Sequence, residues 1–208
     1  PGGDLLPYLK KVEENCDLAL QADPDLEVAY LEEAHSLKLA GEDQINRGED
    51  PTKYLMESEA LARKALKLSP RNARAHTQIG MALLNRGRYL FEKGEDPTEL
   101  LKQAMTYSRS GISANPNYVY AYNNLGICHL IMGDYLTSRT EDPTSAWQEA
   151  IQAFQNAIKI RPDYSGAFNN IGYAYLGLSE WNSAHGKDPY PDAVKAVNSY
   201  QNAIRMNA

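Results

Sequence analysis

Histidine and cysteine, which often act as bases, nucleophiles or metal ligands, are few in this 208-residue chain. The histidines and cysteines are His35, His76, His129, His185, Cys16 and Cys128. His129 follows Cys128 directly, but adjacent side chains on a helix point about 100° apart and cannot ligate one metal ion together. No serine or cysteine has a base at a fixed spacing, and no glycine-rich loop is present to hold a phosphate. We therefore predict no catalytic residue, no metal site and no cofactor.

Acidic side chains are numerous, but those that recur have a structural explanation. The 27 Asp and Glu residues against 21 Lys and Arg give a net charge of −6. This balance argues against a nucleic-acid partner, because neutralising phosphates needs clustered Lys and Arg. Asp-Pro pairs begin at Asp50, Asp96, Asp142 and Asp188, each 46 residues after the last. An aspartate caps a helix that opens with proline, so these carboxylates are expected to start helices.

The same step of 46 residues links four further series of positions and organises the whole sequence. The series are Pro24, Pro70, Pro116 and Pro162; Ala29, Ala75, Ala121 and Ala167; Gly80, Gly126 and Gly172; and Gly41, Gly87 and Gly133, with Ser179 in the next place. Side chains spaced by three or four residues form one helical stripe, for example Tyr122, Leu125, His129 and Met132. Each copy is therefore predicted to be a pair of helices.

The second helix of each pair is predicted to start at the Asp-Pro pair. Gly48, Gly94 and Gly186 precede three of these pairs by two residues and are expected to end the first helix in the left-handed conformation. The predicted elements are a leading helix at about 5–22 and hairpins at about 26–68, 72–114, 118–160 and 164–206. They make a single domain over 1–208, an all-α, right-handed α-solenoid of about nine helices.

One copy of the pattern reads Ala121-Tyr-Asn-Asn-Leu-Gly126, Gly133-Asp-Tyr135, Ala150, Phe154, Ala157 and Pro162. This copy resembles the tetratricopeptide repeat, whose usual period of about 34 residues is about 12 shorter. The extra residues lie between Gly133 and Ala150. We expect both helices to be lengthened, the first to about 20 residues and the second to about 18. The alternative is that the first helix ends at Gly133 and an irregular segment precedes Asp142.

The resemblance implies a non-catalytic scaffold whose first helices form a concave face that binds a protein or peptide partner. By position in the family pattern, the partner-binding residues would be Arg74, Thr77, Met81, Tyr120, Asn123, Asn124, Ile127, Asn169, Asn170 and Tyr173. An asparagine both donates and accepts, which suits the backbone of a peptide of any sequence. The alternative is that these asparagines only hold neighbouring helices together. Glu33 stands where the pattern has an apolar residue, so we expect the first hairpin either to be loosely packed or to be capped by a segment outside this sequence.

The long form of the repeat also resembles the repeats attached to bacterial eukaryotic-like Ser/Thr protein kinases, although no kinase motif occurs in the chain. The chain opens without Met, and its terminal helices are uncapped, so we expect a regulatory or sensory piece of a larger protein such as one of these kinases. The alternative is a structural module that associates with itself through the uncapped ends and extends a longer solenoid. No segment suits direct membrane insertion. We expect a cytoplasmic protein, or an extracytoplasmic one if the array is fused behind a membrane segment.

Overall fold

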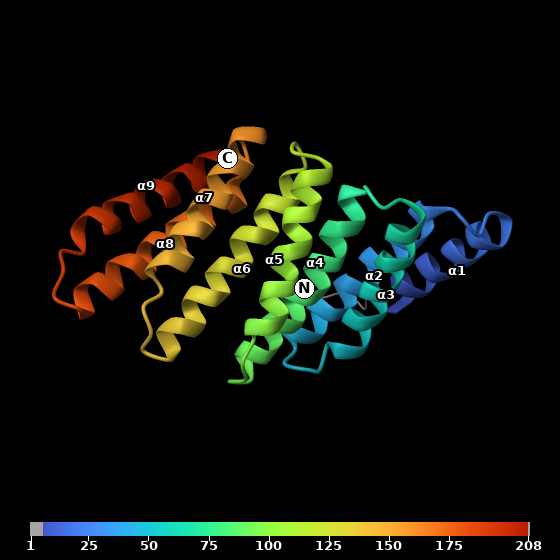
Figure 1. Ribbon diagram of the computed structural model, residues 1–208, viewed down its shortest axis with the longest axis horizontal. Coiled ribbons are helices and arrows are strands. Elements are labelled where there is room, and N and C mark those ends of the chain that lie inside the picture. The colour runs from blue at the N-terminus through green and yellow to red at the C-terminus, as the bar shows by residue number, and fades with distance from the viewer. Residues whose placement is uncertain (1–5, 208) are drawn as a thin grey trace. The chain divides into compact units, whose positions relative to one another are not determined.

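The computed structural model describes residues 6–207, and within that range it contains helices and no strand (Figure 1). The helices are α1 (Leu6–Ala22), α2 (Glu27–Asn46), α3 (Thr52–Leu68), α4 (Ala73–Glu92), α5 (Thr98–Ala114), α6 (Val119–Ser138), α7 (Thr144–Ile160), α8 (Ser165–Ala184) and α9 (Tyr190–Met206). The all-α prediction is confirmed, with nine helices in the described residues. Residue 5, where the leading helix was expected to begin, lies outside them.

The two helices of a hairpin together have more residues than a whole 34-residue repeat. The first helix has 20 residues and the second has 17 in each of the four pairs. α6 runs through Gly133 without interruption and ends at Ser138. The expected lengthening of both helices is therefore confirmed, and the alternative of an irregular segment after Gly133 is wrong.

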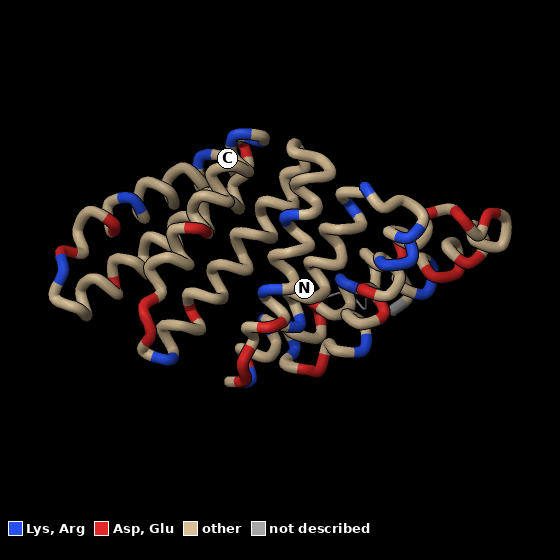
Figure 2. The backbone as a smooth tube through the Cα atoms, viewed as in Figure 1, with Lys and Arg blue, Asp and Glu red and all other residues tan. Residues whose placement is uncertain are grey.

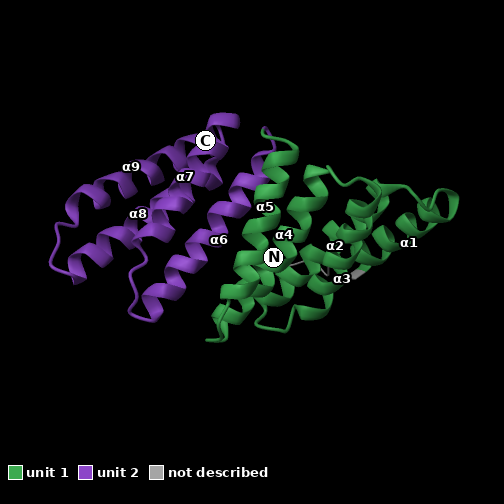
Figure 3. Ribbon diagram, viewed as in Figure 1, with its two compact units in different colours: residues 1–116 green, residues 117–208 purple. Residues whose placement is uncertain are grey.

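The chain divides into two compact units (Figure 3). Unit 1 covers residues 1–116; within it α2 packs against α3 and α4 against α5, while α1 lies on α2 and α3 on α4. Unit 2 covers residues 117–208, where α6 packs against α7, α7 against α8 and α8 against α9. The single domain over 1–208 and the handedness of the stacking stay predictions.

The second helices start as the Asp-Pro pairs predict. The Oδ1 atom of the aspartate accepts a hydrogen bond from the backbone N–H two residues later, in the pairs Asp50–Thr52, Asp96–Thr98, Asp142–Thr144 and Asp188–Tyr190. The intervening proline already has helical dihedrals; Pro51, for example, has φ −82° and ψ −5°. The aspartate is thus the capping residue. Hydrogen bonds from Thr52 lower the pKa of Asp50 below its usual value.

The first helices of three hairpins end in the predicted left-handed glycine. Gly48, Gly94 and Gly186 have φ values of 73°, 77° and 69°. In the third hairpin Thr140 takes this place with φ 58°, a conformation that a β-branched residue adopts only at a cost. The geometry of the turn is therefore set by the repeat and not by the residue that happens to stand there.

Close approach of the two helices in a hairpin explains the series that contains Gly133. A Cβ atom on Gly133 would lie 2.5 Å from Cδ1 of Trp147 and nearer still to its Nε1. Trp147 is 4% exposed and belongs to the core of unit 2. In the last hairpin Ala193 replaces this large partner, and the glycine place is taken by Ser179, whose hydroxyl donates to the carbonyl of Pro189 at 2.9 Å. A side chain is therefore accepted where its partner across the hairpin is small.

Candidate functional site

The predicted partner-binding residues in unit 1 are largely engaged by the unit itself. A guanidinium nitrogen of Arg74 on α4 lies 2.8 Å from a carboxylate oxygen of Glu32 on α2. This hydrogen bond lowers the pKa of Glu32. Thr77 is 2% exposed and donates its hydroxyl to the carbonyl of Ala73, and Met81 is half-buried. A partner could reach Arg74 only in competition with Glu32, and it could not reach Thr77.

Further polar contacts join α2 to α4 along the same side of unit 1. The amide of Asn72 donates to Glu27 at 3.0 Å, and that of Asn85 donates to Glu42 at 3.1 Å. The amide of Gln78 donates to the backbone carbonyl of Leu31 at 3.0 Å. These amides thus donate across the helix pair, although the buried Oε1 atom of Gln78 has no hydrogen-bond partner among the described residues.

The first helices of unit 2 present a different surface. α6 and α8 carry one charged residue each, Asp134 and Glu180, and Figure 2 shows how sparse charge is along them. Asn124 is 2% exposed and therefore lies in the interior. The other candidates stay accessible to different extents: Tyr120 is 46% and Tyr173 45% exposed, Asn169 is exposed, and Asn123, Ile127 and Asn170 are half-buried.

These residues lie on one stripe of each helix, because they are spaced by three, four or seven residues. We refer to this surface as the α6–α8 face and define it by Tyr120, Asn123, Ile127, Asp134, Asn169 and Tyr173. A hydrogen bond joins its two helices: the phenol of Tyr173 donates to Oδ2 of Asp134 at 3.0 Å. Burial raises the pKa of Asp134. Burial together with the Asp134 carboxylate raises the pKa of Tyr173 to about 12, so the phenol stays a donor at neutral pH.

An arginine that was not in the predicted set lies at the other end of the face. The guanidinium carbon of Arg161, just before α8, is 3.9 Å from the ring centroid of Tyr164 and 5.4 Å from that of Tyr120. The ring of Tyr118 meets that of Tyr120 edge-on, with centroids 5.6 Å apart. Sequence reasoning missed Arg161, Tyr164 and Asp134. For Arg161 the signal was its departure from the repeat, since Ser69 and Asn115 hold the same place in earlier copies.

Two of the histidines contact polar groups of the fold, and both cysteines are buried. His129 is 8% exposed, and its Nε2 lies 3.1 Å from a carboxylate oxygen of Glu149. Nε2 of His76 lies 3.1 Å from the carbonyl oxygen of Pro70. Cys16 and Cys128 are both buried. In the part of the chain that is described, no three His, Cys, Asp or Glu side chains converge on a position for a metal ion. None of the helices there has both the length and the apolar character of a membrane span.

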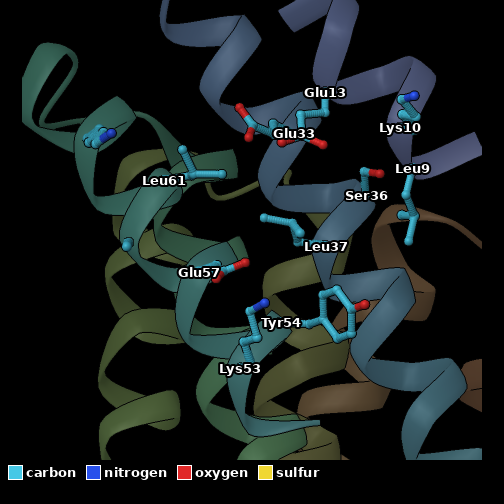
Figure 4. Close-up of a pocket in the computed structure, with 12 residues that line it drawn as sticks. Leu9, Lys10, Glu13, Glu33, Ser36, Leu37, Lys53, Tyr54, Glu57 and Leu61 are labelled. Atoms are coloured by element: carbon cyan, nitrogen blue, oxygen red, sulfur yellow. The ribbon is translucent and has the colours of Figure 1, made fainter. Parts of the chain in front are cut away.

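A cavity of about 510 Å³ in unit 1 lies between α1, α2 and α3 (Figure 4). Glu33 is one of its lining residues, at the place where other copies have Ile79, Leu125 and Ile171, so the cavity lies beside the residue at which looser packing was expected. Burial, together with the carboxylates of Asp17 and Glu13, raises the pKa of Glu33. The charged lining comprises Lys10, Glu13, Glu33, Lys53, Glu57 and Lys64. Both signs are equally represented in this lining, so its composition points to no particular ligand charge.

Two family models match parts of the chain. The model described as "TPR repeat" matches residues 145–179, and the one described as "Tetratricopeptide repeat" matches residues 107–140. Each match runs from a second helix into the first helix of the next pair, and not along a hairpin. The extra residues explain this, because they lie inside the hairpins and leave the connection between pairs at the family's usual length. No curated protein matches the chain.

Solved structures share the arrangement of helices at low sequence identity. "Crystal structure of MamA" is 19% identical with a TM-score of 0.57, and the match covers 99% of this chain and 90% of that one. TTC0263, a thermophilic TPR protein from Thermus thermophilus, is 16% identical with a TM-score of 0.59, covering 97% of this chain and 92% of that one. Identities this low establish likeness of fold alone.

Proposed function

Because the chain carries repeats of the tetratricopeptide family, whose members are generally non-catalytic interaction modules for protein or peptide partners, we propose that it is a scaffold that binds an extended peptide segment on the α6–α8 face. By position, this is the concave face of the family. The observation that carries the proposal is the exposure of Tyr120, Asn169 and Tyr173 on a surface with almost no charge. The corresponding side of unit 1 is closed by its own hydrogen bonds and ion pairs.

The chemistry of the face suits a peptide backbone. Asn123 and Asn169 hold the same place in consecutive hairpins, and each amide can donate to a peptide carbonyl and accept from a peptide N–H. Neighbouring packed helices lie about 10 Å apart, which is about three residues of an extended chain. The two amides can therefore bind one peptide about three residues apart. Tyr120 and Tyr173 add rigid apolar area with a polar tip.

The proposal is tested with the Asn123→Ala/Asn169→Ala double variant. Random peptides displayed on phage are selected on the wild-type protein, and one selected peptide is then measured against each variant. We expect at least tenfold weaker binding for the double variant. The Asn156→Ala/Asn198→Ala variant removes two asparagines from the second helices of the same unit, and we expect less than a twofold change. Failure of the wild type to select any peptide, or equal binding by both double variants, contradicts the proposal.

A second candidate function is self-association through the outer side of α9, and one observation favours it. Val197 and Ile204 are 54% and 70% exposed, whereas Ile151, the equivalent of Val197 one hairpin earlier, is 6% exposed in the core of unit 2. The partner proposed for this surface is a helical hairpin from a second copy of the chain. Sedimentation over a concentration series tests this idea, with Val197→Glu/Ile204→Glu as the variant that should stay monomeric. A wild type that stays monomeric at every concentration argues against it.

The likeness of the Asp-Pro joints to kinase-attached repeats supports a further proposal about the parent protein. The array would be the regulatory or sensory region of a larger cytoplasmic protein such as a bacterial Ser/Thr protein kinase, or of an extracytoplasmic region behind a membrane segment. The reading frame that contains this sequence tests the proposal directly. A frame without a kinase catalytic segment overturns the kinase assignment and leaves the peptide-binding proposal untouched.

A further inference from the structure

Arg161 is placed unlike the arginines that serve the fold. In five others a guanidinium nitrogen lies 2.6 to 2.9 Å from a carboxylate oxygen: Arg47, Arg63, Arg74, Arg86 and Arg88. Among the described residues no carboxylate forms an ion pair with Arg161, and its buried Nε atom has no hydrogen-bond partner. The guanidinium is instead held by the rings of Tyr164 and Tyr120. It is therefore a positioned cation whose donors are not used by a charged group of its own unit.

The two rings prepare this cation for a ligand. A guanidinium that stacks on aromatic rings keeps its charge, and its N–H donors lie in its plane, where they match the two oxygens of a carboxylate. Stacking also restricts the side chain before a ligand arrives, which reduces the entropy lost on binding. Charge-assisted bidentate hydrogen bonds of this kind are among the strongest in proteins.

We propose that Arg161 binds the carboxylate of an Asp or Glu side chain within the extended partner segment on the α6–α8 face. This inference rests on the proposed function and names the chemistry of its partner. Tyr120, which contacts Arg161, and Asp134 are separated by about 21 Å along α6, at about 1.5 Å per residue. Because Asp134 repels a second carboxylate, the acidic residue of the partner belongs at the Arg161 end.

The first experiment selects random 12-residue peptides, displayed inside a fusion so that none has a free carboxyl terminus. Selection is run in parallel on the wild type, Arg161→Gln and Arg161→Glu. We expect Asp or Glu at one position of the wild-type pool and no such preference in the Arg161→Gln pool. The Arg161→Glu pool should instead carry Lys or Arg at that position.

The second experiment measures one selected peptide, with both ends blocked, by fluorescence anisotropy. Arg161→Gln should bind at least tenfold more weakly, and Arg161→Lys, which keeps the charge but not the planar fork, should lie in between. Arg205→Gln on α9 removes the same charge from the same unit, where the arginine donates a hydrogen bond to the amide oxygen of Asn202, and it should change binding less than twofold. Replacing the acidic residue of the peptide with its amide should reproduce the tenfold loss on the wild-type protein, a result that does not depend on the folding of any variant.

The outcomes separate this inference from the proposed function. Peptides selected by the wild type without an acidic preference, or bound equally by Arg161→Gln, overturn the role of Arg161 and leave peptide binding in place. A peptide whose amide analogue binds as tightly has the same meaning. Binding only of peptides with a free carboxyl terminus overturns the side-chain carboxylate. A wild type that selects no peptide overturns both proposals.

Discussion

Replacing Gly133 with alanine is expected to destabilise unit 2, although alanine is the better helix former. The gain in helix propensity is about 1 kcal/mol. Against it, the new Cβ atom lies 2.5 Å from Cδ1 of Trp147. The indole has little room to move, because it is 4% exposed and packs so closely on the backbone of Gly177 that a Cβ atom there would lie 2.8 Å from its Cη2. Overpacking of a core costs about 1 to 3 kcal/mol. With such a close contact the cost is at the upper end, so the net loss is about 1 to 2 kcal/mol.

The measurement is urea unfolding followed by circular dichroism, with Gly166→Ala as a control. A Cβ atom on Gly166 would lie 3.3 Å from Cε2 of Tyr164, a contact that a small movement of the ring relieves, so the gain in helix propensity of up to about 1 kcal/mol is not reversed and Gly166→Ala should not destabilise the protein. The Trp147→Ala background provides the stronger test. There the partner is small, as Ala193 is beside Ser179, and Gly133→Ala should become stabilising by about 1 kcal/mol. If Gly133→Ala stabilises the protein equally in both backgrounds, close approach does not explain the glycine series.

Three further outcomes are expected. Thr140→Gly should stabilise the protein by about 1 kcal/mol in urea unfolding, because φ 58° strains a β-branched residue; a destabilised variant would contradict this. The raised pKa of Glu33 means that this carboxyl group holds its proton more strongly in the folded protein than in the unfolded chain. The free energy of unfolding therefore falls as pH rises from the pKa in the unfolded chain, about 4.3, through the higher pKa in the folded protein. Glu33→Gln should therefore be more stable than wild type at pH 7, with a difference that vanishes in acid; melting curves across pH test this. Tyr173→Phe removes a hydrogen bond to the ionised carboxylate, so the pKa of Asp134, followed by NMR titration, should rise further.

Most of the fold could be predicted from the sequence because its determinants are local. An aspartate at a cap and a proline in the first turn set where a helix begins, whatever surrounds it. The left-handed glycine that ends a helix is equally local, and the structure adds Thr140 at the corresponding place in the third hairpin, which the sequence analysis did not assign. These features recur every 46 residues, so each copy supports the assignment made in the others.

The choice between a continuous first helix and one that ends at Gly133 could not be made from local features. Glycine is frequent both at helix ends and at close contacts. The deciding fact is a tertiary contact: Gly133 faces Trp147 across the hairpin. In the last hairpin Ala193 stands in the place of Trp147, and there Ser179 stands in the place of the glycine. Such a pairing is visible in the sequence only after the two helices are known to lie against each other.

The candidate face was predicted by position in the repeat, which carries no information on burial within a particular copy. Arg74 fits the pattern, but Glu32 on the preceding first helix occupies it. Asn124 fits as well, yet it is 2% exposed. The partner of Arg74 lies on another helix, and the burial of Asn124 depends on how its own copy packs, so only the structure could narrow the ten predicted residues to the face in unit 2.

The positions that are the same in every copy build the array, and for that reason they cannot tell one hairpin from another. A particular partner must be recognised through residues that differ between copies. Arg161 stands where other copies have Ser69 and Asn115, and Tyr120 stands where Arg74 does. These two departures contact each other at one end of the α6–α8 face. Glu33 is also a departure, but it faces a cavity lined by both charges. The informative residues in such an array are therefore departures that meet on an exposed face, and Arg161 with Tyr120 satisfies that condition.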